Sequence, residues 1–178
     1  DMGIGNTTAA GAVVSVITGR PAEDVTGRGT GIDNAALQRK IRVVREAIVR
    51  NRPDRTDGID VLAKVGGFEI GGLSGVILGG AARRVPVVID GFISGAAALI
   101  AVTLCPRARD YLIAGHLSPE PGHRICLEWL GLMPVLDLAM RLGEGTGAAL
   151  AMGLVEGACR VLAEMATFEE GEVSRKGP

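Results

Sequence analysis

The sequence predicts an α/β fold in which helices cover a mostly parallel sheet, and three features lead to this expectation. Two short apolar runs, residues 85–89 and 111–114, have the length and composition of buried strands. Segments with helical periodicity precede and follow each run, so strand, turn and helix alternate as they do in parallel α/β sheets. The 178 residues are 47% apolar and 22% charged, which suffices to bury the core of one domain.

The helical segments have recognisable ends. The first is expected from Thr7 to Thr18, because Asn6 or Thr7 can cap its start, and Gly19 followed by Pro21 can end it. Residues 20–33 are rich in glycine and are expected to form a loop. Further helices are expected at residues 34–51, 58–65, 69–82, 92–104, 121–130 and 146–166.

The ends of the two expected strands predict where a ligand would bind. In parallel α/β sheets, ligands lie beyond the carboxyl ends of the strands. Those ends are Asp90-Gly91 after the first run and Gly115-His116-Leu117-Ser118 after the second. Asp90 could position a ligand there or cap a loop.

Charge and aromatic content argue against two classes of partner. The net charge of −1 gives no field that would attract nucleic acid or an anionic membrane, and five aromatic residues offer little for stacking on bases. The apolar stretch 85–105 raises a membrane span as an alternative, but Pro86, Asp90 and Gly91 divide it into a short strand and a helix. We therefore expect neither nucleic acid nor a membrane as a partner.

The three cysteines and the start of the chain indicate a compartment. Cys105, Cys126 and Cys159 are odd in number, far apart and set in apolar segments, so we expect reduced core thiols rather than disulfides or a metal site. The chain opens without the pattern of a secretory signal. A reducing cytoplasm is the expected location.

Gly3-Ile4-Gly5-Asn6-Thr7-Thr8 has the ingredients of an anion cradle, because glycines let backbone amides approach a phosphate and a helix N-terminus follows. It matches neither the Walker lysine motif nor the full dinucleotide fingerprint, so a capped structural turn is an equally good interpretation. Gly29-Thr30-Gly31 is a second candidate of the same kind, or a plain loop.

Lys40 lies on the apolar side of the helix expected at 34–51. At 100° per residue, one arc of this helix holds Lys40 together with Val43, Ala36, Ala47, Val44, Leu37, Ile48 and Ile41. Arg39, Arg42 and Arg50 lie outside that arc. Burial of an unpaired ammonium is costly, so Lys40 either extends along its methylene stem to water or meets an anion at a site.

Glu144 lies in the run Leu142-Gly143-Glu144-Gly145-Thr146-Gly147, directly before the longest expected helix. A carboxylate that stays ionised there could act as a general base, whereas the local pattern alone favours a helix-capping glutamate. His116 and His123 have no cluster of further ligands around them in the sequence, so no metal site is expected. No serine, histidine and aspartate combination supports covalent catalysis.

Taken in order, these motifs resemble those of the nicotinate-nucleotide–dimethylbenzimidazole phosphoribosyltransferases of cobalamin biosynthesis. The residues that carry the resemblance are Asp1-Met2-Gly3-Ile4-Gly5-Asn6-Thr7-Thr8, Gly27-Arg28-Gly29-Thr30-Gly31, Val87-Val88-Ile89-Asp90-Gly91-Phe92-Ile93, Gly115-His116-Leu117-Ser118 and Leu142-Gly143-Glu144-Gly145-Thr146-Gly147. The resemblance covers nearly the whole chain, which corresponds to the C-terminal half of a typical member.

The resemblance implies an activity and a set of site residues. The family transfers the phosphoribosyl group of nicotinate mononucleotide to 5,6-dimethylbenzimidazole, giving α-ribazole 5′-phosphate and nicotinate without a cofactor or metal. Glu144 falls on the family's catalytic glutamate, and Asp1 stands where many members carry a glutamate. The positions that look like the substrate site are Gly3, Asn6, Thr7, Gly29, Thr30, Gly31, Lys40, Ser118 and Gly145.

The resemblance also implies a larger architecture. The fold would be a three-layer, mostly parallel Rossmann-like sheet flanked by helices, incomplete here relative to the full-length family. Residues 1–168 would be the C-terminal portion of the large α/β domain, with the last helix available to a small helical domain, and residues 169–178 a flexible tail. A homodimer is implied. The alternatives are a non-catalytic nucleotide-binding α/β module and a fragment that folds by self-association.

Overall fold

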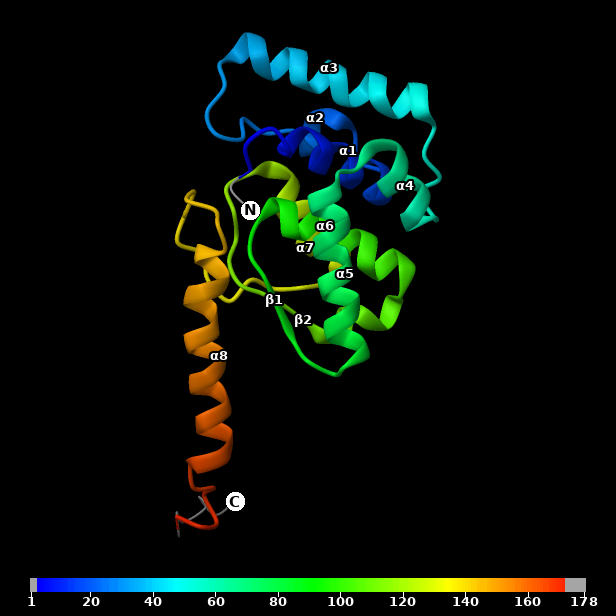
Figure 1. Ribbon diagram of the computed structural model, residues 1–178. Coiled ribbons are helices and arrows are strands. Elements are labelled where there is room, and N and C mark those ends of the chain that lie inside the picture. The colour runs from blue at the N-terminus through cyan, green and yellow to red at the C-terminus, as the bar shows by residue number, and fades with distance from the viewer. Residues whose placement is uncertain (1–2, 172–178) are drawn as a thin grey trace, which may run out of the picture.

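The computed structural model describes residues 3–171 and shows helices packed around a central helix and a small parallel sheet (Figure 1). The elements are α1 (Thr7–Thr18), α2 (Ala22–Val25), α3 (Asn34–Asn51), α4 (Gly58–Val65), α5 (Phe68–Ala82), β1 (Val87–Ile89), α6 (Phe92–Leu104), the 3-10 helix η1 (Pro106–Tyr111), β2 (Leu112–Ala114), α7 (Pro121–Leu130) and α8 (Thr146–Glu164). An α/β fold with a parallel sheet is thus confirmed, although helices far outweigh strands.

Helix α6 is the centre of the core. Residues 95–102 of α6 are all buried, and α1, α4, α5 and α7 pack around them. Small side chains at Gly95, Ala96, Ala97 and Ala98 let these neighbours approach closely. The expected division of the apolar stretch 85–105 into a strand and a core helix is confirmed.

The sheet directs its carboxyl ends toward one side of the body. β1 and β2 are parallel, with Val87 opposite Leu112 and Ile89 opposite Ala114. After β2, His116 and Leu136 form a parallel bridge, and the Leu136 N–H donates to the Gly115 carbonyl. The segment around Leu136 therefore extends the pairing beyond β2.

The expected helices agree with the structure to within about two residues, but the expected loop at 20–33 contains α2, which is too short to show periodicity. The apolar arc of α3 is only partly buried, since Ile41 and Val44 are its buried residues and Val43 is 52% exposed. The expectation of three core thiols is confirmed for Cys126 alone. Burial raises the pKa of its thiol, whereas Cys105 at the end of α6 and Cys159 on α8 are exposed.

Helix α8 extends away from the rest of the molecule (Figure 1). Its first turns contact the body near β1, and within the helix only Gly147 and Ala151 are buried. Leu154 and Leu162 are among its exposed apolar side chains. Of the helices within residues 3–171, α8 is the one long and apolar enough to cross a membrane, which by itself is weak evidence for a span.

Candidate active site

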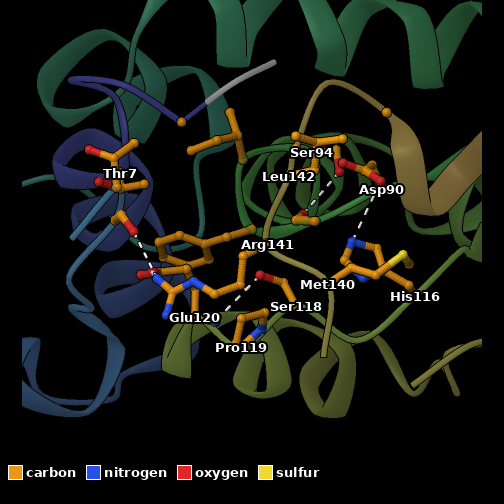
Figure 2. Close-up of a pocket in the computed structure, with 18 of the residues that line it drawn as sticks. Thr7, Asp90, Ser94, His116, Ser118, Pro119, Glu120, Met140, Arg141 and Leu142 are labelled. Atoms are coloured by element: carbon orange, nitrogen blue, oxygen red, sulfur yellow. Dashed lines mark hydrogen bonds and ion pairs between the residues drawn. The ribbon is translucent and has the colours of Figure 1, made fainter. Parts of the chain in front are cut away.

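A cavity of about 550 Å³ lies at the carboxyl ends of β1 and β2 (Figure 2). Helices α1, α6, α7 and α8 all begin at this cavity, and residues at their starts line it: Thr7, Phe92, Glu120 and Ala148. A helix N-terminus carries N–H groups that have no partner within the helix, and a partial positive charge. Four of them around one cavity favour an anionic ligand.

Lys40 joins two segments at one wall of the cavity. Its Nζ donates to Thr7 Oγ1 at 2.7 Å, at the start of α1, and to the Gly27 carbonyl at 2.9 Å, beside the loop Gly29–Gly31. Burial lowers the pKa of Lys40, and the negative charge of Glu120 raises it in part. The ammonium is therefore directed at the cavity wall instead of extending to water.

Asp90, at the end of β1, fixes the start of α8 on the opposite side of the cavity (Figure 2). Its Oδ1 accepts the Ala148 N–H at 3.1 Å and lies 3.5 Å from His116 Nε2. A Cβ on Gly147 would come within 2.0 Å of the His116 ring, so glycine alone permits this close packing. Asp90 therefore holds a helix end and also lines the cavity.

Glu144 lies between two residues that line the cavity, Gly143 and Gly145, at the rim that they form, and its backbone conformation is strained. Its φ is 56°, between Gly143 at 79° and Gly145 at 81°, so three consecutive residues are left-handed. Such a conformation costs a non-glycine residue about 1 to 3 kcal/mol, and residues of this kind cluster at functional sites. Gly143 and Gly145 line the cavity, whereas the Glu144 side chain is exposed.

The helix-capping interpretation of Glu144 is wrong. Gly145 occupies the N-cap position of α8, and the side chain that accepts an N–H in the first turn of this helix is Asp90, not Glu144. The bond that closes the turn is made by Thr146, whose Oγ1 and N–H both donate to the Gly143 carbonyl. The Glu144 side chain is exposed and takes no part in closing this turn.

His123, on α7, holds the loop that carries Ser118. Its Nδ1 accepts the Ser118 N–H at 2.9 Å, so the proton of the neutral ring lies on Nε2. His123 is fully buried, and burial, followed by the charge of His116, lowers its pKa to about 4. The ring is neutral at physiological pH, and the Ser118 side chain faces the cavity.

This buried histidine makes folding stability depend on pH. Because the pKa of His123 is about 4 when folded and near 6.5 when unfolded, the unfolded state binds more protons between these values, and stability falls as pH drops through that window. We expect the free energy of unfolding in urea to fall by about 2 kcal/mol between pH 7 and pH 5 from this residue. A His123→Asn variant, whose Oδ1 can still accept the Ser118 N–H, should show a correspondingly weaker pH dependence. An equal slope in both proteins would contradict this assignment.

The structure gathers most of the residues that the sequence singled out. Seven line the cavity: Gly3, Thr7, Gly29, Thr30, Gly31, Ser118 and Gly145. Lys40 reaches it through Thr7, and Glu144 stands at its rim. Asn6 is not among the lining residues and occupies the N-cap position of α1, and Asp1 lies outside the described residues.

Sequence reasoning missed several residues of the site. Arg28, Glu120 and Arg141 supply charges to the cavity wall, and Met140, Leu142 and Phe92 supply apolar surface. Arg141 could have been predicted from the sequence, because it directly precedes the Leu142–Gly147 run. No pattern in the sequence around Glu120 indicated its place in the cavity. Within residues 3–171, no group of three or more histidine, cysteine, aspartate and glutamate side chains is arranged to hold a metal ion.

Comparison with known proteins gives a consistent result. The sequence model of a family described as "Phosphoribosyltransferase" matches residues 1–173. A nicotinate-nucleotide–dimethylbenzimidazole phosphoribosyltransferase of Chloroflexus aggregans is 68% identical over 176 residues, which are 99% of this chain and 50% of the relative. One of the same name from a Roseiflexus species is 66% identical with the same coverage. The crystal structure of CobT from Thermus thermophilus matches with a TM-score of 0.92 at 50% identity, over 97% of this chain and 51% of that one.

Proposed function

The chain belongs to the nicotinate-nucleotide–dimethylbenzimidazole phosphoribosyltransferase family, and we propose that it provides the nucleotide cradle and the catalytic base of such an enzyme. The chain spans about half the length of the curated relatives it matches. The single observation that carries the proposal is the cavity at which four helices begin, with Lys40 in its wall and Glu144 at its rim.

The proposed reaction transfers a phosphoribosyl group in one displacement. A ring nitrogen of 5,6-dimethylbenzimidazole attacks the ribose C1′ of nicotinate mononucleotide from the face opposite nicotinate, so a β-linkage becomes the α-linkage of α-ribazole 5′-phosphate. The C1′–nitrogen bond to the pyridinium-type ring breaks, and its electron pair neutralises the leaving nicotinate ring. No general acid is needed for that departure. Glu144 takes the proton from the other nitrogen of the acceptor.

The nucleotide phosphate is proposed to lie on the wall formed by Gly3, Thr7 and the loop Gly29–Gly31, next to Lys40. The helix α1 N-terminus and the Lys40 ammonium both favour an anion there. Ser118 and Gly145 would contact the ribose and the acceptor, and Asn6 would hold the α1 start. Asp1 is proposed as a second carboxylate at the site.

Lys40 provides a test of the phosphate position. A Lys40→Ala variant is expected to bind nicotinate mononucleotide about tenfold more weakly, or worse, because a hydrogen bond to a charged phosphate is lost. Isothermal titration calorimetry on the isolated chain would measure this. Lys40→Met, which keeps the apolar stem, should lose affinity equally, and Lys64→Ala, at an exposed lysine paired with Asp60, should lose none. Undiminished affinity in Lys40→Ala would place the phosphate elsewhere.

The larger architecture is part of the proposal. We propose that the two-stranded sheet, which the pairing at Leu136 extends, belongs to a three-layer, mostly parallel Rossmann-like sheet in the longer enzyme. Residues 1–168 would then belong to its large domain, and α8 would lie near a small helical domain. Of the tail expected at 169–178, residues 172–178 lie outside the described residues. A cytoplasmic homodimer that uses no cofactor completes the proposal.

A nicotinate-release assay tests the activity. The unmatched half of the Chloroflexus aggregans relative, joined to this chain as a chimera, should release nicotinate from nicotinate mononucleotide only when dimethylbenzimidazole is present. A second candidate, a nucleotide-binding module without catalysis, is favoured by the exposure of Glu144. Tight nucleotide binding with no acceptor-dependent release by the chimera would support that candidate and contradict the enzyme.

A further inference from the structure

Glu120 brings a buried carboxylate into the part of the cavity where an anion is expected. It occupies the N-cap position of α7, and its side chain is only 12% exposed. A Cβ on Gly27 would lie 2.0 Å from Glu120 Oε2, so the carboxylate packs directly on the backbone whose carbonyl accepts from Lys40. Oε2 is buried and has no hydrogen-bond partner. A carboxylate oxygen in this state is costly unless its charge is balanced nearby.

Two cations provide that balance. Arg141 Nη2 lies 3.7 Å from Glu120 Oε1 and also donates to the Gly29 carbonyl at 3.0 Å (Figure 2). Lys40 donates to the Gly27 carbonyl and is close enough that the charge of Glu120 raises its pKa, against the larger effect of burial. Arg28, which also lines the cavity, is bound to the Ile32 carbonyl and to Asn34. Glu120 therefore faces Lys40 and Arg141 across the glycine loop.

We propose that the Glu120 carboxylate is the counter-charge of Lys40 and Arg141 in the empty cavity, and that an entering phosphate group takes over this role. Glu120 then sets the affinity of the site for anions. Its charge keeps the buried Lys40 protonated and, through Arg141, joins α7 to the loop Gly29–Gly31. The same charge repels a bound phosphate and lowers the affinity of the site for it. The inference rests on the proposed function only in taking the ligand to be phosphorylated.

A different role for Glu120 would have the opposite effect. If its free oxygen accepted a ribose hydroxyl, removal of the charge would weaken nucleotide binding and leave inorganic phosphate unaffected. The two roles can therefore be separated by comparing inorganic phosphate with nicotinate mononucleotide in one variant. Glu120→Gln removes the charge and keeps the shape, and Glu128→Gln, at an exposed position on the same helix, removes an equal charge outside the cavity.

The first measurement needs no ligand. The chain contains three lysines, Lys40, Lys64 and Lys176, so labelling of lysine with 13C at Cε gives three resonances whose titration can be followed without chemical modification. We expect Glu120→Gln to lower the pKa of Lys40 by about half a unit or more, because a favourable charge is lost, and Glu128→Gln to leave it unchanged. An unchanged Lys40 titration in Glu120→Gln overturns the proposal.

The second measurement uses anions. Inorganic phosphate, titrated by calorimetry, should bind Glu120→Gln about tenfold more tightly than the unmodified chain or Glu128→Gln, because a repulsive charge close to the ligand is removed. Equal phosphate affinity, or weaker binding of nicotinate mononucleotide to Glu120→Gln, overturns the inference. If phosphate binds as expected but no protein binds nicotinate mononucleotide, the inference stands and the proposed function fails.

Discussion

Replacement of Glu144 with glutamine is expected to lower the rate of phosphoribosyl transfer by about 10²- to 10⁴-fold, the usual contribution of a general base. Glutamine keeps the shape of the side chain but cannot take the benzimidazole proton. The enzyme to use is the chimera of this chain with the unmatched half of the Chloroflexus aggregans relative. Nicotinate release at saturating concentrations of both substrates gives the rate.

Binding should be unaffected by the same change, because Glu144 lies at the rim and the proposed phosphate wall is formed by Thr7, Lys40 and the loop Gly29–Gly31. The dissociation constant of nicotinate mononucleotide is therefore expected to stay within about twofold of its original value. Glu156→Gln, on the exposed part of α8, is the matched control and should keep full activity. Equal rates in the Glu144→Gln and unmodified chimeras would remove Glu144 from the role of base.

The backbone at Glu144 is consistent with the role of base that we propose for this residue. A left-handed glutamate between two left-handed glycines is held in place by the turn that Thr146 closes, and the start of α8 is fixed by Asp90 and the contact of Gly147 with His116. The loop that carries Glu144 is thus joined to a helix start that Asp90 and Thr146 hold in place. Sequence alone could not separate this arrangement from a capping residue, because both place a glutamate before a helix.

The helices were largely predictable because their signals are local. Apolar periodicity and end residues such as Gly19 define α1, and the pattern at 34–51 defines α3, without knowledge of the rest of the chain. Short helices such as α2, which has four residues, are too short to show a periodic pattern of apolar residues. The exposure of Val43 and of Cys159 depends on what lies opposite α3 and α8, which is a tertiary property that the pattern of one helix does not contain.

The site was predictable where its residues stand in glycine-rich runs or at strand ends, and unpredictable elsewhere. Thr7, the loop Gly29–Gly31 and Ser118 belong to the first group. Glu120 contacts Gly27, and His123 packs against Gly95 of α6, so both contacts are with segments that are distant in the sequence. Nothing in the residues beside them indicates those contacts.

The isolated 178-residue chain is expected to bind nicotinate mononucleotide yet to turn over at less than about a thousandth of the rate of the chimera. Binding depends on the wall that the chain itself contains, from Thr7 to Lys40. Catalysis requires the acceptor to be held in attack geometry, and a displacement of about 1 Å can cost a factor of 10². The exposed Glu144 and the uncovered α8 indicate that the acceptor side of the cavity is open in this chain.

Addition of the unmatched half of the Chloroflexus aggregans relative as a separate polypeptide tests this explanation directly. Nicotinate release should rise with its concentration and saturate, as expected for assembly of a complete site. The Glu144→Gln chain mixed with the same half is the control. It should stay inactive, although it should bind the nucleotide and the added half as well as the unmodified chain does. Full acceptor-dependent turnover by the 178-residue chain alone would show that the acceptor pocket is complete within these residues. In that case the exposed face of α8 would need a different explanation, one that does not involve acceptor binding.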